Sequence, residues 1–233
     1  MGRTQTGASW SAAGRDLTAA ASLKVVFHVK HDALRSAAAQ LDLRLGADAV
    51  DELIRLSELL RDRAAPLGFI SAGDADHILE RHVIDSLRAA PHLTEGSAID
   101  LGSGAGLPGL PVAIARPDLD VTLLEAQRRR VAFLEMLCDE LGVRNAAPRQ
   151  GRAESFNGTA MSCLARAFAP MARSWAAAVP LLEPGGSLIY FAGAAADVSQ
   201  EVAALTPSPG HVRIVAPPAV LASAGPLVIM TVQ

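Results

Sequence analysis

From residue 97 to the C-terminus, the sequence alternates between two kinds of segment, and this alternation constrains the fold more than any other feature. Short apolar runs typical of β-strands alternate with longer stretches that carry apolar residues at helical spacing. Strands are expected at 97–102, 120–126, 145–151, 161–168, 187–193, 211–217 and 227–232, and helices at 108–117, 128–142 and 170–186. This order predicts a mostly parallel, doubly wound α/β sheet of seven strands. The last two strands have no helix between them, so one of them is expected to be antiparallel.

The segment before residue 97 is expected to be helical. Residues 31–45 and 47–65 form two predicted helices separated by Gly46, and a third runs through 76–90 and ends at Pro91. In the second helix Asp48 is placed as the N-cap, and an apolar stripe follows at Val50, Leu53, Ile54 and Leu60. The first 24 residues lack a sustained apolar face and are expected to be a disordered extension. The chain therefore divides into 1–24, a helical subdomain at 25–92 and an α/β domain at 93–233.

The third helix has one apolar face, formed by Ile78, Leu79, Val83 and Leu87. On its other positions, Arg81 and Asp85 are expected to fix the helix against the sheet, and His82 is expected to be packed or to act as a cap. Trp175 lies at helical spacing and Cys163 lies within a strand, so both are expected in the core.

Composition excludes several classes of protein. Half of the 233 residues are apolar and 19% are charged, but no apolar run approaches the ~20 residues of a membrane helix. The two cysteines match no metal-binding spacing, so free thiols in a cytoplasmic, metal-free protein are expected, and we expect a monomer. The net charge of −3 is not typical of a nucleic-acid-binding protein, so any RNA contact must come from a local basic cluster.

The glycine-rich stretch AIDLGSGAGLPGLPVAIARPD (98–118) fits two different cofactor loops. Gly104, Gly106 and Gly109 satisfy the Gly-x-Gly-x-x-Gly fingerprint of dinucleotide-binding proteins. Read instead from Asp100 through Gly102, Gly104 and Gly106, the same stretch fits the loop that binds S-adenosylmethionine. Because it follows the first strand of a doubly wound sheet, a ligand is expected there in either case.

Flanking residues favour the methyl donor over a pyrophosphate. Pro108 and Pro111 each remove a backbone N–H from the start of the following helix, where a pyrophosphate would need donors. The carboxylate of Asp100 would repel a pyrophosphate but could help to hold the cationic end of S-adenosylmethionine. Glu125, at the end of the second strand, is placed to accept hydrogen bonds from ribose hydroxyls in both classes. On this geometry we assign Asp100, Gly104 and Glu125 to the cofactor site.

Four sequence stretches resemble one known family in order and nearly in spacing. They are ERHVIDSL (80–87), AIDLGSGAGLPGLPVAIARPDLDVTLLEAQRRRVAFL (98–134), GRAE (151–154) and ARAFA (165–169). They resemble the bacterial 16S ribosomal RNA guanine-N7 methyltransferase family RsmG, also called GidB. The resemblance implies a class I, Rossmann-like methyltransferase that transfers a methyl group from S-adenosylmethionine to N7 of a guanosine in the 530 loop of 16S rRNA. Its partner would be 16S rRNA or the small ribosomal subunit.

Residues are carried over from the family position by position. The resemblance places Gly102, Leu107, Ala153, Glu154 and Arg166 in the cofactor site, with Ala153 and Glu154 near the adenine. Arg166 would face the methionine end of the donor or the target base. No catalytic base is expected, because guanine N7 carries a lone pair and no proton at neutral pH.

The arginines after the second strand have two interpretations. They are either a solvated face or the phosphate contacts that dominate RNA affinity, namely Arg128, Arg129, Arg130 and Arg152. The sequence also departs from the family, since the Lys-Gly pair usual after the fifth strand is absent from YFAGAAA (190–196). A diverged relative that is weakly active, or that is non-catalytic and binds the ribosome, is therefore an alternative function. A nucleotide-binding Rossmann protein is a further alternative.

Overall fold

The structure is a computed structural model that describes residues 29–233. The expected extension at 1–24 lies outside the described residues. Within 29–233, no helix combines the length and the apolar character that crossing a bilayer requires.

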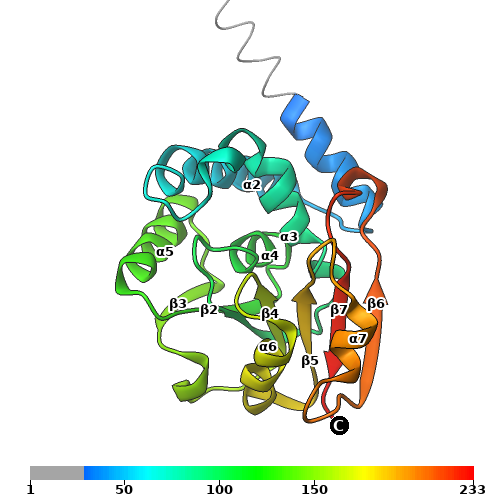
Figure 1. The fold of residues 1–233 in the computed structure, drawn as a ribbon. Coiled ribbons are helices and arrows are strands. Elements are labelled where there is room, and N and C mark those ends of the chain that lie inside the picture. Colours follow the sequence, from blue (N-terminus) through cyan, green and yellow to red (C-terminus); the bar gives the residue numbers. More distant parts are fainter. Residues whose placement is uncertain (1–28) are drawn as a thin grey trace, which may run out of the picture.

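A seven-stranded sheet forms the centre of the molecule, as the alternating sequence pattern predicts (Figure 1). Its strand order is β3-β2-β1-β4-β5-β7-β6. The five strands from β3 to β5 in this order are parallel, and β7 is antiparallel to both of its neighbours. The expected antiparallel strand is therefore β7. The bounds are β1 Gly96–Leu101, β2 Leu119–Glu125, β3 Ala146–Gln150, β4 Ala160–Arg166, β5 Leu182–Phe191, β6 His211–Val215 and β7 Leu227–Thr231.

Helices cover both faces of the sheet and give two apolar clusters (Figure 1). One face packs against α4 (Gly109–Ala115) and α5 (Arg128–Leu141), and the other against α6 (Met171–Ala178) and α7 (Val198–Ala203). Helix α7 is an addition to the elements expected from the sequence. Trp175 of α6 is 1% exposed, and its indole N–H donates to the carbonyl of Pro207 at 2.6 Å, so its expected place in the core is confirmed. Cys163 is also buried, as expected.

The helices before the sheet pack on α4 and α5. Residues 29–40 are helical, α2 spans Ala47–Leu59, and a π-helical turn continues it over Leu60–Ala64. The expected stripe from Val50 to Leu60 is buried in the same apolar cluster as α4 and α5. The expected cap is wrong: Gly46 is the N-cap residue of α2 and no side chain caps it, while Asp48 lies in the first turn. There its carboxylate interacts favourably with the helix dipole.

The third helical segment is less regular than the sequence pattern indicates. It consists of a 3₁₀ turn at Ala72–His77, a π-helical turn at Leu79–Ile84 and the short α3 at Asp85–Leu87. Its expected apolar face is buried as a unit, at Ile78, Leu79, Val83 and Leu87. The expected end at Pro91 is wrong, because α3 ends at Leu87 and Pro91 lies inside a further 3₁₀ turn at Ala90–His92. The subdomain boundary at residue 92 stays a prediction.

Close packing of α4 on β1 and β2 makes Gly109 a sensitive position. A Cβ at residue 109 would lie 2.3 Å from Leu123 Cδ2 and 2.6 Å from Asp100 Oδ2. We expect Gly109→Ala to lower the free energy of unfolding by about 1–3 kcal/mol, the usual effect of overpacking. Gly46→Ala, where the added Cβ meets nothing within 4 Å, is the control and is expected to change it by less than about 1 kcal/mol. Urea unfolding measures both, and equal midpoints for the two variants would contradict the prediction.

Candidate functional site

The glycine-rich loop after β1 uses its own backbone donors internally. Gly102, Gly104 and Gly106 have φ values of 65°, 59° and 92°, a region that side chains other than glycine's disfavour. The N–H of Gly106 and that of Leu107 both donate to the Ser103 carbonyl, at 2.8 and 3.1 Å. The N–H of Ser103 donates to the Leu124 carbonyl at 3.0 Å. These donors are unavailable to a pyrophosphate, which disfavours the dinucleotide interpretation of the fingerprint.

Asp100 holds this loop from beneath. Its Oδ2 accepts hydrogen bonds from Ser103 Oγ at 2.5 Å and from the Gly109 N–H at 3.0 Å. The side chain is buried, and burial raises the pKa of its carboxyl to about 6 against the opposing effect of these two bonds. Asp100 lines none of the cavities described below. It therefore positions the loop, while its Oδ1 is buried and has no hydrogen-bond partner among residues 29–233. The direct contact with the methyl donor expected from the sequence stays a prediction.

Glu125 is the second carboxylate that binds the loop. It is the last residue of β2 and is 4% exposed. Its Oε2 accepts from the Gly104 N–H at 3.0 Å, and its Oε1 accepts from the Gln127 N–H at 2.8 Å. Because each carboxylate oxygen has a further lone pair, Glu125 can still accept from a ligand's hydroxyls.

Two adjoining cavities lie along the carboxyl ends of the parallel strands. We call the first, of about 290 Å³, the Glu125 cavity, and the second, of about 340 Å³, the loop cavity. Of the residues expected at the site, the Glu125 cavity is lined by Gly102, Glu125, Arg130, Arg152, Ala153 and Glu154. The loop cavity is lined by Gly102, Gly104, Leu107, Arg130 and Arg166. Arg128 and Arg129 line neither cavity.

Several residues that line these cavities were not expected from the sequence. Phe168 covers Gly102 so closely that a Cβ there would lie 2.6 Å from its ring, which explains the glycine. Phe69, which lines the loop cavity, packs edge-on against Phe133 and lies under two guanidiniums, those of Arg129 and Arg130. The only sequence signal for these contacts is that aromatic residues and glycines lie close together. That pattern is common in protein cores.

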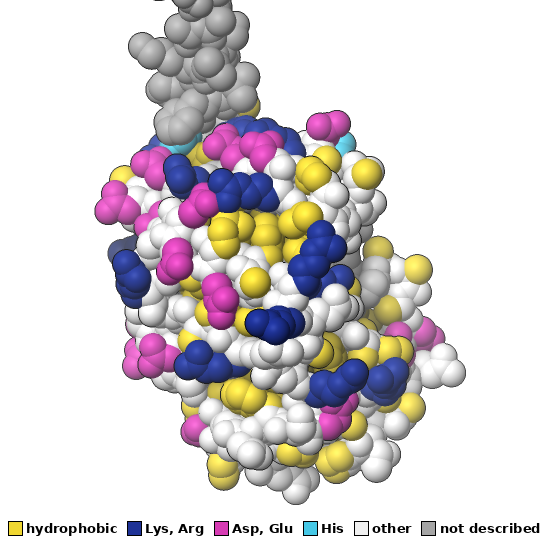
Figure 2. All heavy atoms as spheres, turned by 90° about the vertical axis from the view of Figure 1, so that its left-hand side faces the viewer, with side chains coloured by type: hydrophobic (Ala, Val, Ile, Leu, Met, Phe, Trp, Pro, Cys, Tyr) yellow, Lys and Arg dark blue, Asp and Glu magenta, His cyan; other side chains and the backbone are white. Residues whose placement is uncertain are grey.

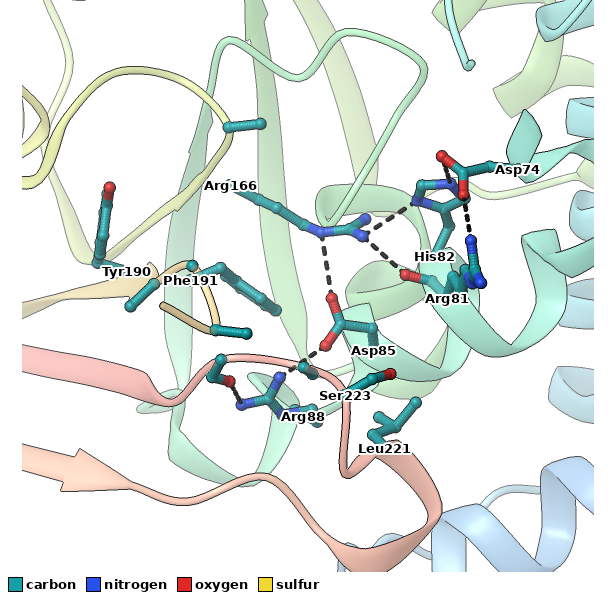
Figure 3. Close-up of a pocket in the computed structure, with 16 residues that line it drawn as sticks. Asp74, Arg81, His82, Asp85, Arg88, Arg166, Tyr190, Phe191, Leu221 and Ser223 are labelled. Carbon is teal, nitrogen blue, oxygen red and sulfur yellow. Dashed lines mark hydrogen bonds and ion pairs between the residues drawn. The ribbon is translucent and has the colours of Figure 1, made fainter. Parts of the chain in front are cut away.

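A third and larger cavity, of about 620 Å³, lies beside the loop cavity, and we call it the Asp85 cavity (Figure 3). It lies between the 3₁₀ and π-helical segment 72–84, the end of β5 and the loop before β7. Arg88, Arg166, Tyr190 and Phe191 are among its lining residues. Ala192, Gly193 and Ala194 also line it, at the place where the family's lysine is absent. Ala167 lines all three cavities, so they meet at the end of β4.

Arg166 joins the ERHVIDSL segment to the end of β4 (Figure 3). Its Nε lies 3.2 Å from Asp85 Oδ2, and its Nη2 donates to the Arg81 carbonyl at 2.8 Å. Asp85 Oδ1 in turn accepts from Arg88 Nη1 at 2.6 Å, and Arg88 Nη2 donates to the Gly225 carbonyl at 2.7 Å. Asp85 therefore fixes the helix to the sheet, as expected, but the Arg81 side chain does not. It is exposed and pairs with Asp74 at 2.9 Å.

His82 completes this network. Its Nδ1 lies 3.0 Å from Arg166 Nη2, a guanidinium atom that can only donate, so Nδ1 accepts. Burial, together with the nearby charge of Arg166, lowers the pKa of His82. A neutral imidazole is therefore expected at neutral pH. Burial also lowers the pKa of Arg166, which stays charged beside Asp85.

Comparison with known proteins gives one consistent family. The family model described as "rRNA small subunit methyltransferase G" matches residues 49–208. A protein of that name from Acidothermus cellulolyticus is 41% identical over 143 residues, which cover 61% of this chain and just under two thirds (64%) of the relative. Its counterpart from Kineococcus radiotolerans is 38% identical over 187 residues, covering 78% of this chain and 72% of the relative.

Solved structures share the fold at low sequence identity. Trm5b from Pyrococcus abyssi has a TM-score of 0.52 at 12% identity and covers 70% of this chain and 50% of its own. The tRNA m1G37 methyltransferase of M. jannaschii has a TM-score of 0.50 at 11% identity, covering 64% and 49%. These likenesses concern the architecture alone, and they agree with the class I, Rossmann-like fold expected from the sequence.

The raised pKa of Asp100 gives a test of its burial. Folded Asp100 holds its proton up to about pH 6, whereas an unfolded aspartate releases it near 3.8. The contribution of Asp100 to the free energy of unfolding is therefore fully present below pH 3.8 and is lost as the pH rises towards 6. We expect the free energy of unfolding of the wild type to fall by about 3 kcal/mol relative to Asp100→Asn across this window. Urea unfolding of both proteins at a series of pH values measures the difference, and parallel curves would contradict the assignment.

Proposed function

Because the chain belongs to the rRNA small subunit methyltransferase G family and its cofactor is S-adenosylmethionine, we propose that it methylates N7 of a guanosine in the 530 loop of 16S rRNA. The observation that carries this proposal is the meeting of the three cavities at Ala167. S-adenosylmethionine bound in the Glu125 cavity and the loop cavity would present its methyl group beside the larger Asp85 cavity. The substrate would be 16S rRNA or the small ribosomal subunit, and the enzyme would act as a cytoplasmic monomer.

The described residues suit S-adenosylmethionine. Glu125 would accept from the ribose hydroxyls, and Ala153 and Glu154, which also line the Glu125 cavity, would lie near the adenine. The loop cavity would hold the methionine portion against Gly102, Gly104 and Leu107. Gly104 leaves room for a ligand, because a Cβ there would lie no closer than 3.7 Å to the Gly102 carbonyl.

The Asp85 cavity would receive the target guanine. Its volume of about 620 Å³ can hold a base together with part of its ribose and phosphate. Phe191 and Tyr190 offer aromatic surface for stacking, and Arg166 lies between this cavity and the loop cavity. Arg166 would then position the base next to the donor.

The reaction needs positioning more than proton transfer. S-adenosylmethionine supplies an electrophilic methyl group attached to a sulfonium. Guanine N7 would attack the methyl carbon with its lone pair while the bond from that carbon to sulfur breaks and S-adenosylhomocysteine leaves with the bonding pair, so no residue would have to remove a proton. The chain's residues would hold N7 and the methyl carbon in line, which is where rate acceleration would arise. The buried network of Asp85, Arg166 and His82 is already fixed by ion pairs and hydrogen bonds and so suits this role.

Surface arginines would supply the RNA contacts. Arg128, Arg129 and Arg152 are exposed, and Arg152 lines the Glu125 cavity. On the face of the molecule that bears α5, basic side chains are interspersed with acidic ones and form no continuous patch (Figure 2). Phosphate contacts are therefore proposed at these individual residues around the cavities, with the concave site supplying specificity.

Replacement of guanine by 7-deazaguanine tests the target atom directly. The protein is expected to transfer labelled methyl from S-adenosylmethionine to a 16S rRNA or small-subunit substrate, and mass spectrometry should detect N7-methylguanosine. A transcript that carries 7-deazaguanosine at the methylated position lacks the attacking lone pair and is expected to accept no label. Transfer to the 7-deaza transcript would contradict the N7 assignment. Donor binding without transfer to any form of the substrate would instead indicate the non-catalytic ribosome-binding relative.

Gly104→Val tests the loop as the donor site. The added side chain would project into the loop cavity, so calorimetry is expected to show loss of S-adenosylhomocysteine binding. Gly142→Val is the matched control, since Gly142 has a similar φ of 69° but lies in open space at the end of α5. Gly142→Val should lose a comparable amount of stability and keep the wild-type affinity for S-adenosylhomocysteine. Unchanged binding by Gly104→Val, or binding of NAD in place of the methyl donor by the wild type, would contradict the assignment.

A further inference from the structure

The side chain of Arg130 has an unmet hydrogen-bonding requirement at the centre of the site. Its Nε is buried and has no hydrogen-bond partner among residues 29–233. Its nearest carboxylate oxygen, Glu125 Oε2, lies 3.8 Å from Nη1, beyond hydrogen-bond length. Buried donors without partners are costly, so an acceptor brought by a ligand would stabilise this guanidinium.

The guanidinium of Arg130 is held where a bound methyl donor would contact it. Arg130 lines both the Glu125 cavity and the loop cavity. Its guanidinium carbon lies 5.5 Å from the centre of the Phe69 ring, a stacking contact that restricts its orientation. A Cβ on Gly104 would lie 3.9 Å from its Nη1, so this nitrogen faces the open space above the glycine. The neighbouring residue Arg129 also stacks on Phe69, with its guanidinium carbon 5.4 Å from the ring centre, but Arg129 lines neither cavity.

The positive charge of the residues that line the loop cavity favours a bound anion. Among its lining residues are two guanidiniums, those of Arg130 and Arg166, and no carboxylate. Arg166 is already paired with Asp85 and bonded to the Arg81 carbonyl. Arg130 has only the 3.8 Å ion pair with Glu125 and no hydrogen bond to it, so its positive charge is the more available of the two to a bound anion.

We propose that Arg130 binds the carboxylate of the methyl donor. This inference rests on the proposed function, in which the donor's ribose lies at Glu125 and its methionine portion lies in the loop cavity. The carboxylate is the donor's only anionic group, and a guanidinium matches it with parallel N–H donors. Arg130 is thereby a donor-binding residue, distinct from the RNA-contacting role that its sequence position among three arginines indicated.

The test compares two donors that differ only in this carboxylate. The wild type is expected to bind S-adenosylmethionine about 10- to 100-fold more tightly than decarboxylated S-adenosylmethionine in calorimetry, as for a charge-assisted hydrogen bond. Arg130→Gln is expected to remove this preference by weakening S-adenosylmethionine alone. Its affinity for the decarboxylated donor should stay the same or rise slightly, because one repulsive positive charge has been removed. Arg130→Lys, which keeps the charge but not the planar fork, should give an intermediate preference.

Arg129→Gln is the matched control, because it removes the other stacking contact on Phe69 without touching either cavity. It is expected to keep the wild-type preference. The proposal is overturned if Arg130→Gln weakens both donors equally, which would indicate an effect through Phe69 or Glu125. It is also overturned if that variant leaves both affinities unchanged and raises only the KM for RNA. Failure of the wild type to bind either donor would instead contradict the proposed function.

Discussion

Two buried carboxylates at the ends of adjacent strands hold the glycine-rich loop in place, and the geometry of the whole site depends on them. Asp100 of β1 binds the N–H of Gly109 and the hydroxyl of Ser103, while Glu125 of β2 binds the N–H of Gly104. The Gly109 N–H lies at the start of α4, where it would otherwise be presented to an anion, and the Gly104 N–H is a loop donor that is likewise occupied. The same residues that shape the loop therefore make it unsuitable for a pyrophosphate. They also leave open space above Gly104 in the loop cavity.

A second network closes the opposite side of the site, and it differs from the first because it is ionic. Arg166 at the end of β4, Asp85 at the start of α3 and Arg88 one turn later form a chain that ends at the Gly225 carbonyl, with Asp85 and Arg88 buried and Arg166 half-buried. Truncating one member would leave its partner charged and unpaired in a buried position, a large penalty. The chain spans segments far apart in the sequence, so it fixes the helical segment, β4 and the loop before β7 in one arrangement. Both cavities that Arg166 lines depend on that arrangement for their shape.

The sequence was a reliable guide to the sheet because strand and helix periodicities are local. The seven strands, the reversed strand at the end and the glycine that ends α5 were all predictable on that basis. It was a poorer guide to Asp48, Pro91 and Arg81, whose roles depend on which neighbour a side chain meets. Gly46, and not Asp48, is the N-cap residue of α2, and Arg81 pairs with Asp74 in the adjacent 3₁₀ turn. Partners of this kind, even those only a few residues away, leave no periodic signal in a single sequence.

The arginines illustrate the same limit at the site and explain how an acidic protein can attract anions. Arg128, Arg129 and Arg130 are adjacent in sequence, yet a helix turns successive side chains in different directions, and only Arg130 reaches the cavities. With a net charge of −3, the chain has no excess of positive charge to spread over its surface. Its cationic groups at the site lie instead within concave walls, where salt screens them much less than it screens exposed charges. Attraction at short range inside the cavities can therefore select a carboxylate or phosphate even though the surface as a whole does not favour polyanions.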